Sequence, residues 1–135
     1  MNVFYSFNHN TTSLLVSLVG IIILILIRKK IPSHTYLKNI WISAFVFFIL
    51  YFFIVLITSI QGVYYWKIHN SYDLNKNGFI ENIEKTKGYL KAHRNITNDT
   101  ARNLAFISGA FVSLFISLIV LAIGFIRTNS FKKRQ

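Results

Sequence analysis

The sequence predicts an all-α integral membrane protein with three transmembrane helices. Three long apolar runs, none containing a charged residue, lie in a chain of 135 residues. Charged residues make up only 14% of the chain, whereas a soluble domain averages about a quarter. Backbone groups inside lipid must bond within their own segment, so each run is expected to be a helix. The rest of the chain is too short to cover three buried helices, which argues against a soluble helical core.

The three runs have the length that a bilayer requires. About 20 helical residues, at about 1.5 Å each, cross a hydrocarbon core about 30 Å thick. The second and third runs meet this length, and the first reaches it when Asn10 and Thr11 extend it. We therefore expect a single membrane domain with spans at 12–27, 40–60 and 104–126, connections at 28–38 and 61–102, and a tail at 127–135.

The first run is expected to remain as a membrane anchor. No Lys or Arg precedes it between Met1 and Asn10, whereas Arg28, Lys29 and Lys30 follow it directly. A secretory signal peptide has the opposite order of charge and ends in a small-residue cleavage site, which is missing here.

Basic residues predict the orientation of the chain. Four of the 15 Lys and Arg residues lie in 28–38 and four in 127–135, whereas 61–102 has seven in 42 residues and 1–11 has none. Dense Lys and Arg beside short loops mark the cytoplasmic side. We therefore expect the N-terminus and 61–102 outside, and 28–38 and the C-terminal tail in the cytoplasm. The abundance of Asn, Lys, Ile and Phe is typical of an AT-rich bacterial genome, so the expected location is a bacterial plasma membrane.

Composition also argues against several functions. The net charge of +11 is explained by topology, and no expected cytoplasmic segment is long enough to fold into a nucleic-acid-binding face. The spans contain no Asp, Glu, Lys, Arg or His, whereas transporters and voltage sensors usually need at least one such residue in their spans. Cysteine is absent, which excludes disulfides and thiolate chemistry. No paired nucleophile and base is evident, so we do not expect an enzyme.

One motif with recognisable chemistry lies in the long connection. Residues 73–84 read DLNKNGFIENIE. This segment resembles the EF-hand calcium loop, which is twelve residues long and ligates through positions 1, 3, 5, 7, 9 and 12, with Gly at position 6. The resemblance implies a Ca²⁺ site formed by side-chain oxygens of Asp73, Asn75 and Asn77, the backbone carbonyl of Phe79, Glu81 directly or through water, and both carboxylate oxygens of Glu84.

The residue types suit a hard cation. Calcium takes oxygen ligands, and Gly78 permits the sharp turn because glycine reaches positive φ without strain. Ile80 is expected to pack inward. The chain has only four acids, and three of them fall at ligand positions. The alternative is a turn rich in Asn and Gly between two helices, for which the same residues are also suited.

The departures from the family pattern indicate a weak site. Asn stands at positions 3 and 5 where Asp is usual, and Lys76 adds positive charge. We expect a dissociation constant of about 10⁻⁴–10⁻³ M, as in extracellular modules. Residues 62–72 are expected to continue the second span as the incoming helix, and 81–94 to form the exiting one. Residues 97–100 then offer N-cap candidates for the third span.

A pattern of small residues on the third span leaves two alternatives open. Small residues recur there at four-residue spacing, which favours close helix packing, either within the chain or with a second copy or partner membrane protein. They are Ala105, Gly109, Ser113 and Ser117.

The four histidines are scattered at spacings that indicate neither a metal site nor a catalytic dyad; they are His9, His34, His69 and His93.

The function expected from the sequence is weak Ca²⁺ binding by a multi-pass membrane protein, as a sensor or as a calcium-stabilised accessory subunit. The alternatives are a scaffold or subunit of a larger membrane complex, with 73–84 as a plain turn, and a small oligomeric channel.

Overall fold

The computed structural model describes residues 9–31 and 36–132. Every regular element in these residues is helical. The elements are α1 (His9–Ile27), the short 3₁₀ helix η2 (Arg28–Lys30), α2 (Tyr36–Asn70), α3 (Lys87–Thr97), α4 (Thr100–Asn103) and α5 (Ala105–Lys132). Within the described ranges, three helices are long and apolar enough to cross a membrane. The predicted all-α architecture with three such helices is confirmed.

The helices extend beyond the apolar runs that predicted them. The helix α2 has 35 residues and is about 52 Å long, so it exceeds the hydrocarbon core of a bilayer by about 20 Å. Residues 61–70 contain no proline and continue the helix past the predicted end of the second span. The helix ends where the amide of Ser71 donates to the carbonyl of Lys67 and the polar segment 71–86 begins. The expected incoming helix is therefore the end of α2 itself.

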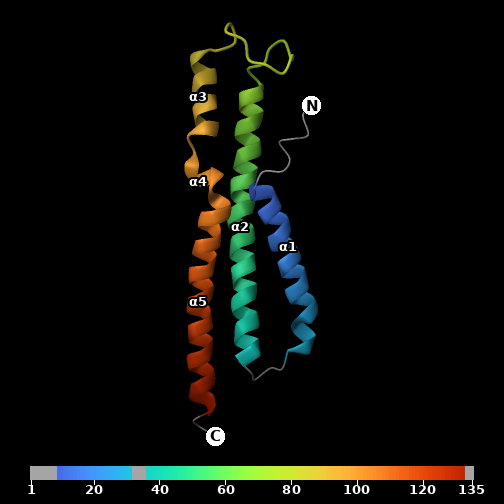
Figure 1. The fold of residues 1–135 in the computed structure, drawn as a ribbon, viewed down its shortest axis with the longest axis vertical. Coiled ribbons are helices and arrows are strands. Elements are labelled where there is room, and N and C mark those ends of the chain that lie inside the picture. The colour runs from blue at the N-terminus through green and yellow to red at the C-terminus, as the bar shows by residue number, and fades with distance from the viewer. Residues whose placement is uncertain (1–8, 32–35, 133–135) are drawn as a thin grey trace.

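The helix α2 lies between the other two long helices (Figure 1). It packs along both α1 and α5, whereas α1 and α5 touch each other at few points. Successive long helices run in opposite directions, and α1 diverges from α5 along its length (Figure 1). The helix α3 packs against the end of α2 that extends beyond the apolar run.

The small-residue pattern on α5 packs against α2 of the same chain. Ala105, Ser113 and Ser117 are 2%, 0% and 4% exposed, and Gly109 is also buried. A Cβ atom at Gly109 would lie 2.9 Å from Cγ2 of Ile54, which is too close. Lipid offers no hydrophobic drive for helix association, so small residues that allow close approach are what such an interface needs. The four residues are thus buried within the chain itself, and at Gly109 the neighbour is α2.

Hydrogen bonds from side chains to backbone carbonyls join the long helices. Ser43 Oγ donates to the carbonyl of Ser117 at 2.6 Å, and Tyr51 Oη donates to that of Phe106 at 2.9 Å. Both bonds link α2 to α5. Trp41 Nε1 donates to the carbonyl of Leu24 at 2.8 Å and links α2 to α1. Each bond gives a polar side-chain group a partner on a neighbouring helix, as is common between membrane helices.

Arg102 joins α2, α3 and α4. Its side chain is 6% exposed, and one of its terminal nitrogens donates to the carbonyls of Asn95 and Ile96 at 2.9 and 3.0 Å. The guanidinium lies 5.0 Å from the centre of the Tyr65 ring. Asp99 is 3.6 Å from the other terminal nitrogen of Arg102, and its side chain caps α4 by accepting from the amide of Arg102. Asp99, a residue of the predicted 97–100 segment, therefore caps the short helix α4, whereas the third long helix, which this segment was expected to cap, is α5 and begins only at Ala105.

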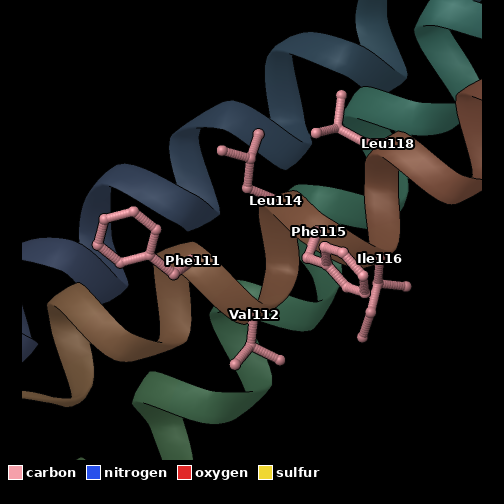
Figure 2. A pocket seen from close by; sticks show the side chains of 6 residues that line it. All are labelled: Phe111, Val112, Leu114, Phe115, Ile116 and Leu118. Atoms are coloured by element: carbon pink, nitrogen blue, oxygen red, sulfur yellow. The ribbon is translucent and has the colours of Figure 1, made fainter.

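The outer face of α5 is apolar and open. Its side chains line a groove and point away from the ribbon in Figure 2. These residues are Phe111, Val112, Leu114, Phe115, Ile116 and Leu118. An apolar exposed face on a long apolar helix suits contact with lipid chains.

Candidate functional site

The segment 71–86 connects α2 to α3 at one end of the molecule (Figure 1). The exiting helix was predicted to begin at Glu81, but α3 begins six residues later, at Lys87. Thr86 caps it, with its side-chain oxygen accepting from the amide of Tyr89 at 3.2 Å. Glu84 consequently lies in a turn before the helix instead of in its first turn.

Backbone conformation bends the loop at two residues. Gly78 has φ +86°, as expected for the glycine at this position, and apart from its two chain neighbours no residue has an atom within 4 Å of the place where its Cβ would be. Lys76 also has a positive φ, 56°. Residues other than Gly, Asn and Asp adopt this backbone conformation only at an energetic cost.

Oxygens of the first three predicted ligands accept hydrogen bonds from the loop backbone. Asp73 Oδ2 accepts from the amide of Gly78 at 2.9 Å, and Asn75 Oδ1 accepts from that of Asn77 at 3.0 Å. Asn77 Oδ1 in turn accepts from the amide of Phe79 at 2.8 Å. Each oxygen thus folds the chain back onto itself two to five residues further on, which is the usual action of Asn and Asp in turns.

Glu84 holds both halves of the loop. Its Oε1 accepts from the amides of Leu74 at 2.8 Å and Asn75 at 3.4 Å, and its Oε2 accepts from the amide of Glu81 at 3.0 Å. The residue is only 6% exposed. The hydrogen bond from Glu81 lowers the pKa of this carboxyl below its ordinary value, with smaller contributions from Leu74 and Asn75, while partial desolvation opposes the shift. The carboxylate is therefore ionised at neutral pH.

The Asp73 carboxylate has one oxygen without a hydrogen-bond partner. Its Oδ1 is buried, and no hydrogen-bond donor among the described residues reaches it. Beside it in the loop, Glu81 Oε1 accepts from the side-chain amides of Asn75 at 3.3 Å and Asn77 at 2.9 Å. A buried carboxylate oxygen without a hydrogen-bond donor is costly, and either a donor or a cation would satisfy it.

The six predicted ligand residues share this loop but do not form a closed ligand shell. Within the part of the chain that the structure describes, no three His, Asp or Glu side chains cluster closely enough to hold one metal ion. The oxygens of Glu84 are bonded to backbone amides, and the side chain of Phe79, for which only the carbonyl was assigned, is 77% exposed. Ile80, expected to pack inward, is half-buried.

Two histidines that sequence spacing did not connect lie side by side. His69, at the end of α2, and His93, on α3, bring ring nitrogens to 3.4 Å. They flank the loop from both sides, 24 residues apart, and only the packing of α3 on α2 reveals the pair. His9 stacks instead on Phe106, and His34 lies outside the described residues.

These features define a helical membrane protein with three potential spans and a polar, acid-containing loop between the second and third long helices. The chain matches no protein-family model, no curated protein and no solved structure.

Proposed function

We propose that this protein binds Ca²⁺ weakly through the loop Asp73–Glu84 on the outer face of the membrane, as a sensor or as a calcium-stabilised accessory subunit. The observation that carries the proposal is the buried Oδ1 of Asp73, which has no hydrogen-bond donor among the described residues. It belongs to position 1 of the twelve-residue pattern, where a calcium loop has its first carboxylate ligand.

The distribution of basic residues supports an outer location for the loop. The segments 28–38 and 127–135 are dense in Lys and Arg, and three crossings put 61–102 on the side opposite both. Calcium is plentiful outside cells, so a site with a dissociation constant of about 10⁻⁴–10⁻³ M would bind the ion there.

Calcium would supply a positive charge to oxygens that are now bonded within the loop. The side chains of Asp73, Asn75, Asn77 and Glu81, the carbonyl of Phe79 and both oxygens of Glu84 would hold it. Glu84 would have to release three backbone amides, and Glu81 would have to release the side-chain amides of two asparagines. These exchanges oppose binding and support a weak site.

The loop is linked directly to two membrane helices. The helix α2 runs without interruption from the apolar span to Asn70, and α3 and α4 connect the loop to α5. The helix α3 begins directly after the loop, where the side chain of Thr86 accepts a hydrogen bond from the amide of Tyr89. Binding in the loop would therefore restrict the angle between α2 and α3, and we propose this as the means of sensing.

Calorimetric titration of the purified protein in detergent tests the proposal. The wild-type chain should take up one Ca²⁺, and Glu84→Gln should weaken binding by at least about tenfold, because it removes a bidentate carboxylate. Asp99→Asn is the matched control: it removes the one acid outside the loop but keeps a good N-cap residue. Equal affinity in the wild type and Glu84→Gln would refute the site.

The main alternative is a scaffold in which the loop is only a turn. The hydrogen bonds of Glu84 to the amides of Leu74, Asn75 and Glu81 favour it, since they order the loop with no ion. Trypsin separates the two functions. Cleavage after the exposed Lys85 should slow in millimolar Ca²⁺ if the ion orders the loop, and should not change if the loop is a turn.

A further inference from the structure

The end of α2 and the face of α3 bring two imidazoles together beside the calcium loop. His93 Nδ1 lies 3.4 Å from His69 Nε2, and the ring centroids are 5.6 Å apart. Tyr89 packs on both rings, with centroids 5.2 Å from His69 and 5.6 Å from His93. Tyr89 is only 8% exposed, so the two imidazoles pack against a buried side chain.

The distance between the two nitrogens suits a shared transition-metal ion. Zinc binds imidazole nitrogen at about 2.0–2.1 Å with tetrahedral geometry, so two nitrogens on one zinc ion lie about 3.3–3.4 Å apart. Imidazole is a ligand of choice for zinc, copper and nickel, whereas calcium takes oxygen.

The second nitrogen of His69 has an acceptor. His69 Nδ1 lies 3.4 Å from Asn70 Oδ1. With its proton on Nδ1, directed to this amide oxygen, His69 presents the lone pair of Nε2 toward His93. Metal-binding histidines are commonly oriented in this way, through a hydrogen bond from the nitrogen that does not bind the metal.

We propose that His69 and His93 form a second metal site, which takes a zinc-like transition-metal ion with two imidazole nitrogens and completes its coordination with water. The exposed position of His93 gives the ion access from solvent. The site differs from the proposed calcium loop in its residues and in its ligand chemistry, so either site can fail without the other.

Such an ion would fasten α3 to α2. The two histidines belong to the two helices that flank the loop, so an ion bound by both closes that loop at its base. Its occupancy would restrain the same pair of helices that the calcium loop joins.

Zinc titration of the full chain in detergent tests the site, with a purification tag that contains no histidine. The wild type should bind one Zn²⁺ per chain, and His69→Gln and His93→Gln should each weaken binding by more than about tenfold. His9→Gln is the matched control, since His9 stacks on Phe106 instead. Glu84→Gln should leave zinc binding unchanged. Unchanged zinc affinity in His93→Gln, or equal weakening in His9→Gln, would overturn the proposal.

Copper provides a measurement that is independent of any folding defect in a variant. Electron paramagnetic resonance of the wild-type chain with one equivalent of Cu²⁺ should show coupling to two imidazole nitrogens, and His93→Gln should show one. A wild-type spectrum with one imidazole nitrogen or none would mean that the pair is only a hydrogen bond.

Discussion

The side-chain amide of Asn10 donates a 2.9 Å hydrogen bond to the backbone carbonyl of Arg102, 92 residues further along the chain. The Oδ1 atom of the same side chain accepts from the amide of Phe106 at 3.1 Å. In an uninterrupted α-helix this carbonyl and this amide would bond to each other, because they are four residues apart. Asn10 is inserted between them at the break between α4 and α5, and it is 3% exposed.

Replacement of Asn10 by Leu should destabilise the protein by about 1–3 kcal/mol, because it removes the side-chain donor to the Arg102 carbonyl and the acceptor for the Phe106 amide. Thermal unfolding of the detergent-solubilised chain measures the effect. Thr12→Leu, at an exposed position of α1, is the control and should change little. Equal stability of the wild type and Asn10→Leu would show that Arg102 and Phe106 bond directly once the side chain is removed.

Acid should loosen the loop through Glu84. The folded state lowers the pKa of Glu84 below 4.5, so its contribution to stability is fully present above pH 4.5 and is lost as the pH falls through the lower, folded-state value. Amide chemical shifts of Leu74 and Glu81 should therefore stay constant from pH 7 to about 5 and move at lower pH. In Glu84→Gln this titration should vanish; its persistence there would assign it to another acid.

Substitution of alanine for Gly109 and for Gly62 should have different effects on the stability of the protein. At Gly109 a Cβ meets Ile54 Cγ2 at 2.9 Å, so Gly109→Ala should cost about 1–3 kcal/mol through overpacking of α5 on α2. At Gly62 nothing lies within 4 Å, so Gly62→Ala should leave stability unchanged or raise it by up to about 1 kcal/mol. Thermal unfolding of both variants in one detergent compares them. An equal effect of the two substitutions would contradict the close approach of the helices.

Two loop substitutions should act in opposite directions on calcium binding. Gly78→Ala strains a residue at φ +86° by about 1–2 kcal/mol, so it should weaken binding. Lys76→Asn places a residue that tolerates φ 56° and removes a positive charge beside the proposed ligands, so it should strengthen binding. Calorimetry on both variants checks the sign of each change. A parallel change in the two variants would argue against the loop as the site.

The orientation can be tested with single cysteines, since the chain has none of its own. Lys76→Cys should react with an impermeant maleimide on intact cells, and Lys30→Cys only after the membrane is opened. The expected contrast follows from the distribution of basic residues. Reaction of Lys30→Cys alone on intact cells would place the loop in the cytosol and remove the basis for an extracellular calcium site.

Apolar length was enough to predict the three long helices, because lipid forces any such segment into internal hydrogen bonding. Their ends were harder to predict. The chain from Gln61 to Asn70 is more polar than the run before it yet remains helical, and α3 packs on α2. The pattern of small residues from Ala105 to Ser117 correctly indicated a close interface, but spacing alone could not say which helix would fill it.

The candidate sites show a similar division. The positive φ of Gly78 follows from local chemistry and was predicted, whereas the late start of α3 depends on Thr86 acting as its cap. Nothing local marks His69 and His93 as neighbours, since their contact arises only when α3 folds back along α2. The same applies to Asn10, whose two partners lie at the far end of the chain.

The length of α2 gives the loop a mechanical connection to the thickness of the bilayer. Residues 62–70 continue α2 as one helix, a helical rod that extends about 13 Å past the apolar run. Tilting of a long helix by about 20°, a usual response to a thinner membrane, would carry the tip of this rod sideways by about 4–5 Å. The loop and α3 are attached to that tip, so a change of lipid alone would shift both candidate metal sites sideways along the membrane surface.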